Sequence, residues 1–115
     1  MRHSNANRKF GRVRKVRNAL VKSLARSLVL HGKILTTEAK AKEIRSYVEK
    51  MVTQGRTGTV ATRRLIIAKI GEDGATKLMS DLAPKYADRA GGYTRITKLP
   101  RRLSDGAAQA VIEFV

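Results

Sequence analysis

The chain has 115 residues, 42% of them hydrophobic, which suits one small domain with a modest core. It carries 25 Lys and Arg against 9 Asp and Glu, and a net charge of +16 indicates a polyanionic partner, most commonly nucleic acid. The absence of cysteine excludes disulfides and thiolate metal sites, and no apolar run is long enough to cross a membrane.

The basic residues are concentrated at the N-terminus. Residues 1–37 contain ten Lys or Arg and no acid, because the first carboxylate is Glu38. Residues 1–10 show no periodicity, so we expect a basic extended arm over residues 1–11 and a single RNA-binding domain over residues 12–115. A mitochondrial transit peptide is the alternative for such a leader, and the apolar stripe that follows it argues against cleavage.

The first helix is predicted from about residue 12 to residue 31. Apolar side chains recur there at spacings of three and four, and Gly32 suits the left-handed residue that ends a helix. Residues 34–37 predict a short strand, and Thr37 can cap the helix that follows. The stripe expected to face the core of the first helix comprises Val13, Val16, Leu20, Leu24 and Leu28.

Three helices are predicted next. The first buries a stripe of small and aliphatic residues and ends at Gly55 and Gly58. The second covers about residues 60–70 with Leu65 and Ala68 inward, and the third covers about residues 74–83 before Pro84. The stripe of the first of these helices consists of Ala41, Ile44, Val48, Met51 and Val52.

The hydrophobic period changes to two over residues 93–99 and 107–115, which predicts two strands joined by a turn with Pro100, Asp105 and Gly106. The predicted fold is therefore α+β, in the order α-β-α-α-α-β-β. Helices are expected to pack on a small mixed sheet of about three strands.

The acid-free N-terminal segment is the strongest candidate for binding nucleic acid. Guanidinium and ammonium groups pair with phosphates, and an ordinary solvated face would mix acids among them. The candidate residues here are Arg2, His3, Arg8, Lys9, Arg12, Arg14, Lys15, Arg17, Lys22 and Arg26.

A second candidate lies within residues 88–102. Gly91 and Gly92 permit a close backbone approach, and Tyr93 either stacks on a base or lies in the core after a plain glycine turn. The surrounding basic residues favour RNA contact, and we expect Asp88 and Asp105 to hold arginines rather than act in catalysis. These basic residues are Arg89, Arg95, Arg101 and Arg102.

An enzyme is disfavoured, since no catalytic triad, carboxylate pair, phosphate loop or metal-ligand set is evident, and no cofactor, metal or small-molecule substrate is expected. A nuclease would need clustered acids or histidines. An architectural DNA-binding protein is the main alternative, although it would need a symmetric dimer surface or an apolar wedge.

Several motifs resemble the bacterial-type large-subunit (50S) ribosomal protein L17 family. They are the opening Met-Arg-His, Ala-Arg-Ser-Leu-Val at 25–29, Thr36-Thr37, Ala-x-Arg-Arg-Leu at 61–65 and Arg-Ala-Gly-Gly-Tyr-Thr-Arg-Ile at 89–96. The resemblance covers nearly the whole chain. Ser4 and Val16 depart from it, where the family often has a basic residue and a histidine.

This resemblance implies a structural subunit of a cytoplasmic ribosome, with mitochondrial and plastid ribosomes as the alternative. It implies binding to large-subunit (23S) ribosomal RNA near the polypeptide exit, support of subunit assembly and translation, and contact with neighbouring large-subunit proteins. One copy per ribosome is expected. The expected mechanism combines phosphate neutralisation by the arm with docking of residues 91–93 on folded RNA.

Overall fold

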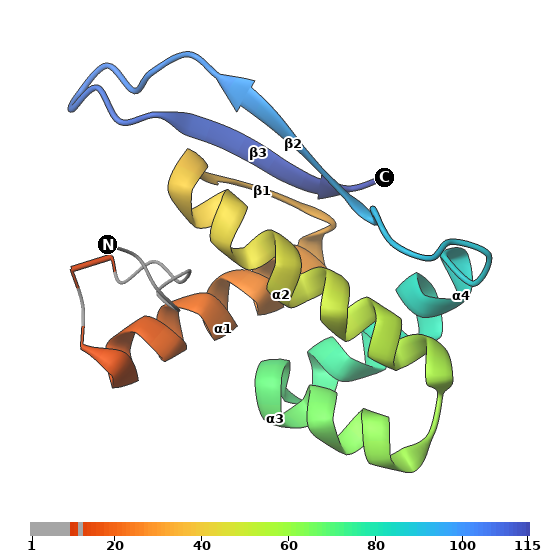
Figure 1. Ribbon diagram of the computed structural model, residues 1–115. Coiled ribbons are helices and arrows are strands. Elements are labelled where there is room, and N and C mark those ends of the chain that lie inside the picture. The colour runs from red at the N-terminus through yellow and green to blue at the C-terminus, as the bar shows by residue number, and fades with distance from the viewer. Residues whose placement is uncertain (1–9, 12) are drawn as a thin grey trace, which may run out of the picture.

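The computed structural model describes residues 10, 11 and 13–115. Apart from Phe10 and Gly11, the expected arm lies outside the described residues. The elements are α1 (Arg14–His31), β1 (Lys33–Thr37), α2 (Glu38–Thr57), α3 (Val60–Lys77), the π-helical turn η1 (Leu78–Leu82), α4 (Ala83–Lys85), β2 (Thr94–Leu99) and β3 (Gln109–Phe114). The α+β class is confirmed: Figure 1 shows the strands as one layer against α1 and α2, with α3 below these helices.

The three strands form an antiparallel sheet in the order β1-β3-β2. Ile112 in β3 pairs with Ile34 on one side and with Ile96 on the other, so the C-terminal strand is central. The expectation of a mixed sheet is wrong, because both pairings are antiparallel. Strands β2 and β3 form a hairpin, which is antiparallel because no crossover connects its strands, and β1 pairs with the other side of β3 in the same sense.

Local sequence signals explain the end of α1 and the start of α2. Gly32 adopts φ 82° and donates its N–H to the Leu28 carbonyl at 2.8 Å, as expected for a glycine after a helix. The Thr37 hydroxyl accepts the Lys40 N–H at 3.4 Å, which confirms the predicted cap.

Helix α2 is the centre of the core, since it contacts the sheet on one side and α1, α3 and η1 on others. Its predicted stripe is confirmed, because all five side chains are fully buried. Gly58 ends the helix with φ 70°, but the prediction that Gly55 also ends it is wrong. Gly55 is buried inside α2, where an added Cβ would lie 2.5 Å from Leu78 Cδ2, so it permits close packing.

The predicted break between two helices occurs at Gly71, which has φ 84° and ψ 170° within the span of α3. The predicted inward residues of the first segment are wrong, since Ile66 and Ile70 are buried while Leu65 is 54% exposed. Pro84 does not follow the last helix but lies in its first turn. The sequence of α3 has apolar residues on more than one face, but only one face packs against the core. The hydrophobic pattern alone therefore does not identify the buried face.

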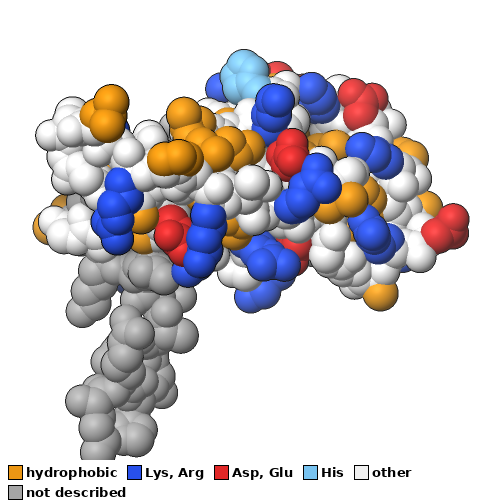
Figure 2. All heavy atoms as spheres, turned by 90° about the horizontal axis from the view of Figure 1, so that it is seen from above, with side chains coloured by type: hydrophobic (Ala, Val, Ile, Leu, Met, Phe, Trp, Pro, Cys, Tyr) orange, Lys and Arg blue, Asp and Glu red, His pale blue; other side chains and the backbone are white. Residues whose placement is uncertain are grey.

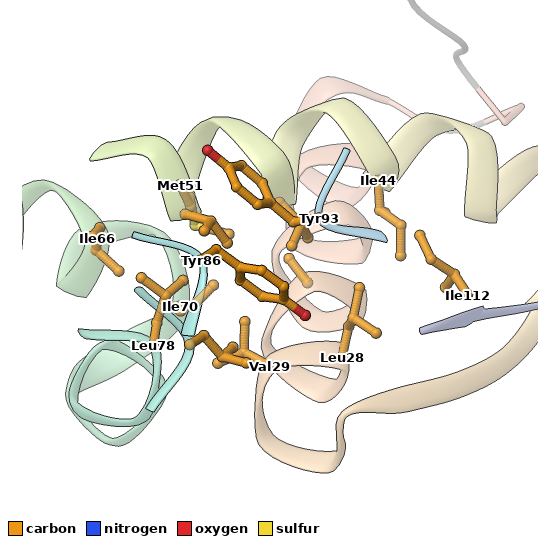
Figure 3. Packing of buried hydrophobic residues seen from close by; sticks show 14 of the residues in the cluster. Leu28, Val29, Ile44, Met51, Ile66, Ile70, Leu78, Tyr86, Tyr93 and Ile112 are labelled. Atoms are coloured by element: carbon orange, nitrogen blue, oxygen red, sulfur yellow. The ribbon is translucent and has the colours of Figure 1, made fainter. Parts of the chain in front are cut away.

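Aromatic residues fill the core between α2, η1 and the sheet. The rings of Tyr86 and Tyr93 lie 5.2 Å apart and are tilted by 49°, and Figure 3 shows them among aliphatic side chains from α1, α2 and α3. The Tyr86 hydroxyl donates to the Val115 carbonyl at 2.6 Å, and Val115 N–H donates to the Tyr93 carbonyl at 3.0 Å. These bonds tie the C-terminus to the segment that precedes β2.

Candidate nucleic-acid interface

The sequence-predicted residues of the N-terminal segment fall into two groups. Arg2, His3, Arg8, Lys9 and Arg12 lie outside the described residues. The others lie on α1, where Arg14, Lys15 and Lys22 are exposed and Arg17 is half-buried. Within the described part of the chain, none of these four forms an ion pair, so their charges are available to an external anion.

The first turns of α1 extend away from the core, as Figure 1 shows. Val13 is 70% exposed and Val16 is 50% exposed, so the prediction that the buried stripe begins with these residues is wrong. The contacts of α1 with the core begin at Val21 and Leu24. The projecting turns of this helix expose the basic side chains of Arg14 and Lys15.

The N-terminus of α1 adds to this positive potential. Val13, at the cap position, makes no side-chain cap, and the first turn contains no acid. The free N–H groups and the aligned peptide dipoles of a helix favour an anion at its N-terminus. Arg14, Lys15 and Arg17 belong to this first turn, so backbone and side chains attract the same kind of ligand.

Arg26 differs from its neighbours on α1, because it forms an ion pair with Asp73 just after the break in α3. The Gly74 N–H, donating at 2.9 Å, and the Arg26 guanidinium together lower the pKa of the Asp73 carboxyl. Arg26 therefore connects α1 to α3 within the protein, and its guanidinium is only partly available to phosphates.

The prediction that Tyr93 stacks on a base is wrong. Its side chain is fully buried, and its hydroxyl donates to the Arg89 carbonyl at 3.1 Å and lies 3.1 Å from the Thr53 hydroxyl. The hydrogen bond with Thr53, followed by the Arg56 guanidinium at 3.1 Å, lowers the pKa of the Tyr93 phenol. The alternative interpretation, a core tyrosine after a glycine turn, is the one that the structure supports.

Arg56 organises this loop, although sequence reasoning did not single it out. Its guanidinium donates to the carbonyl of Arg89 at 2.6 Å and to the carbonyl of Ala87 at 2.8 Å. Glu49 adds a second anchor, since its Oε1 accepts the hydroxyl of Thr94 at 3.0 Å. An arginine in the last turn of a helix is usually explained by the helix dipole, so its partners in a later loop left no local signal.

Gly91 and Gly92 are exposed, and Gly92 adopts φ 64°. No heavy atom lies within 4 Å of a Cβ built at either position, so the protein itself does not require their small size for packing. Arg89 is exposed beside them. The two glycines therefore leave an open backbone surface next to a basic side chain.

The arginines of β2 and of the hairpin turn have partners within the protein. Arg95 donates to Glu113 at 2.7 Å across the β2–β3 pair, and Arg101 donates to the Gly106 carbonyl at 2.9 Å. Arg102 pairs with Asp105 at 3.2 Å, which confirms the expectation that Asp105 holds an arginine. Asp88 forms no such pair among the described residues.

The outer face of the sheet is chemically mixed. Figure 2, which views the molecule from above the sheet, shows hydrophobic side chains among basic and acidic ones. At the start of β1, Lys33 lies opposite Glu113, which already pairs with Arg95. Near the other end, Glu38 pairs with Lys42 at 2.9 Å and with Lys98 at 3.4 Å, and these lysines lower the pKa of its carboxyl. This face is less suited to a polyanion than the acid-free end of α1.

Residues 10, 11 and 13–115 contain neither a metal-binding cluster nor a membrane-spanning helix. No group of three His, Cys, Asp or Glu residues there could hold a metal ion. No helix in the same part of the chain is both long enough and apolar enough to span a membrane.

Comparison with known proteins supplies independent information. A model of the family described as ribosomal protein L17 matches residues 20–115. A protein of Trichlorobacter lovleyi is 51% identical over 116 residues, covering all of this chain and 94% of its own length. Relatives from Gemmatimonas aurantiaca and Campylobacter jejuni are 49% and 48% identical, covering all of this chain and 98% and 99% of theirs. All three are named large ribosomal subunit protein bL17.

Proposed function

The chain belongs to the ribosomal protein L17 family, and from this premise we propose that it binds large-subunit ribosomal RNA as a non-catalytic structural component. The name of its relatives, large ribosomal subunit protein bL17, supports its assignment as a component of the large ribosomal subunit. We further propose a cytoplasmic ribosome, one copy per large subunit near the polypeptide exit, and neighbouring ribosomal proteins as additional partners. In this role the protein supports assembly of the subunit.

The projecting end of α1 is the observation that carries the RNA-binding proposal. Arg14, Lys15, Arg17 and Lys22 form no ion pair in the described structure, and the first three belong to the first turn of a helix whose N-terminus has no side-chain cap. A free protein gains no stability from such a cluster, because like charges repel. Phosphates would neutralise it and release counterions, which is the main driving force for binding nucleic acid.

The open backbone at Gly91 and Gly92, with Arg89 beside it, is the second proposed contact. Tyr93 contributes to it by holding the loop against α2 rather than by touching RNA, because its ring is buried. Shape and phosphate recognition of this kind carries little sequence information, so specificity would come from the fold of the RNA.

Salt dependence of binding tests the proposal. Arg14, Lys15 and Arg17 are replaced together by Gln, and affinity for a large-subunit RNA fragment is measured over a range of salt concentrations. The log–log slope should fall by about two to three units if each side chain neutralises one phosphate. The matched control replaces Lys40, Lys50 and Arg64 by Gln, which removes the same charge elsewhere and should change the slope less.

Two results would contradict the proposal. Equal slopes for the two triple variants would show that α1 has no special role. A preference for duplex DNA over the ribosomal RNA fragment would instead favour the architectural DNA-binding alternative.

Co-sedimentation of the wild-type chain with the large subunit after a moderate-salt wash, at one copy per subunit, tests the proposed incorporation into the large subunit.

A further inference from the structure

A groove between three helices combines basic and apolar side chains. We call it the three-helix groove. It encloses about 720 Å³. Its walls come from α1 and α3, and Tyr47 of α2 contributes to its lining. The residues that matter for its chemistry are Arg14, Arg17, Val21, Tyr47, Leu65 and Lys69.

The apolar side chains of this groove are not fully used by the core, since Val21 and Tyr47 pack against it but remain partly exposed. Leu65 is 54% exposed, although the helix that carries it buries Ile66 and Ile70. Tyr47 is half-buried, whereas the other two tyrosines of the chain, Tyr86 and Tyr93, are buried. An exposed leucine beside a partly exposed aromatic ring, in a concave site, is a surface that an apolar or planar group can cover.

The charged part of the groove selects an anion. Arg14, Arg17, Lys22 and Lys69 line it, against one carboxylate, that of Glu43. The Lys69 ammonium lies 5.5 Å from the centroid of the Tyr47 ring, so a flexible side chain covers the ring face. A phosphate in the groove would offer this ammonium a stronger partner than the ring, and the ring would then become accessible.

We propose that the three-helix groove accepts an unpaired nucleotide of the bound RNA, with its base against Leu65 and Tyr47 and its phosphates on the arginines of α1. This inference rests on the proposed function and specifies what part of the RNA binds there. A nucleotide combines the flat apolar face of its base with a phosphate, which matches the apolar and the basic side chains of the groove. Bases inside a duplex are stacked and cannot present that face, so the groove discriminates against paired RNA.

The test uses the full-length protein with two fluorescein-labelled probes, a short oligouridylate and a blunt RNA duplex of matched length. Leu65→Gln should weaken binding of the oligouridylate about tenfold, as expected for loss of one base contact, and leave duplex binding unchanged. Val60→Gln is the matched control, because Val60 is 66% exposed on the same helix and does not line the groove. It should change neither affinity. Lys69→Gln, which retains Leu65, should also weaken binding of the oligouridylate.

Photo-crosslinking identifies the contact directly. An oligouridylate containing 4-thiouridine should crosslink to the tryptic peptides 46–50 and 65–69, which carry Tyr47 and Leu65. Crosslinks confined to other peptides would overturn the proposal, as would equal effects of Leu65→Gln and Val60→Gln. If Leu65→Gln spares RNA affinity but lowers incorporation into large subunits, the occupant is a protein neighbour and the proposal is wrong.

The failure of this inference can be distinguished from failure of the proposed function. If the wild-type protein binds a large-subunit RNA fragment and the duplex, but the groove variants behave as wild type, only the groove assignment is lost. If the wild-type protein binds none of the RNA probes above background, the RNA-binding function itself is wrong.

Discussion

The N-terminal half of α1 and the segment from Arg89 to Arg102 are both rich in arginine, but the two regions use this residue differently. In the later segment, Arg95 and Arg102 have carboxylate partners, and Arg101 donates to a backbone carbonyl. On α1, Arg14 and Arg17 form no ion pair within the described structure, although Glu43 lines the same three-helix groove. The comparison teaches that the local supply of acceptors, rather than the number of arginines, decides which basic residues are available to RNA.

Replacing Tyr93 by Ala should produce the largest loss of stability. This variant tests whether Tyr93, in the later segment, serves the fold of the protein. Removal of a fully buried aromatic ring costs about 3–5 kcal/mol of unfolding free energy. Urea unfolding measures this loss, and Tyr93→Phe should cost only about 1 kcal/mol through its missing hydroxyl. If Tyr93→Ala instead melts normally but loses RNA affinity, the ring contacts RNA and the comparison fails.

Arg56→Gln should have the next largest effect. It removes guanidinium donors from the carbonyls of Ala87 and Arg89 and from the Tyr93 hydroxyl, so we expect a loss of about 1–2 kcal/mol. Hydrogen exchange should increase over residues 87–93 while α1 is unaffected. Arg64→Gln is the control, being an exposed arginine without these partners, and an equal loss in it would contradict the assigned role of Arg56.

Arg17→Gln tests the opposite side of the comparison. Because the Arg17 side chain forms no ion pair or hydrogen bond in the described structure, the free energy of unfolding should change by no more than about 0.5 kcal/mol. The salt slope of RNA binding should fall by about one unit. A large drop in melting temperature with an unchanged slope would show that Arg17, like Arg56, serves the protein's own fold.

The smallest expected effect concerns Glu38, the acid that follows the acid-free segment. Its pKa is lowered from the ordinary value of 4.5 by the hydrogen bond from Lys42 and by Lys98, so the fold favours the charged form. This contribution to stability is present at neutral pH and is lost as pH falls below 4.5 toward the lower pKa of the folded state.

Glu38→Gln should therefore flatten the dependence of unfolding free energy on pH between neutrality and about pH 3. Urea unfolding at several pH values measures this slope. The control is Glu72→Gln, since the side chain of Glu72 is exposed and forms no ion pair among the described residues. Identical pH profiles for Glu38→Gln and the wild-type protein would show that the charged Glu38 side chain does not contribute to stability.

Much of the secondary structure could be predicted because its signals are local. Gly32, Thr37, Gly58 and Gly71 each mark an end or a break in a helix through backbone preferences that need no distant partner. The buried stripe of α2 was predictable because its apolar residues recur with the helical period on one face. That face is buried because α2 is covered on several sides.

The candidate site was predictable in part. The sequence alone marks Arg14, Lys15, Arg17 and Lys22 as basic residues without nearby acids, and the structure leaves all four without an ion pair. It did not show that Arg26 faces Asp73, which is 47 positions away in the chain. Long-range pairs of this kind depend on how α1 and α3 pack.

Composition, charge distribution and hydrophobic periodicity thus determined the α+β class, most helix boundaries and the basic character of the N-terminal segment. These properties follow from each residue and its near neighbours. Only the tertiary structure decided the strand order, the burial of Tyr93, the role of Arg56 and the exposure of Leu65. Burial of a particular side chain is a property of the elements that cover it, and those elements are brought together only when the chain folds.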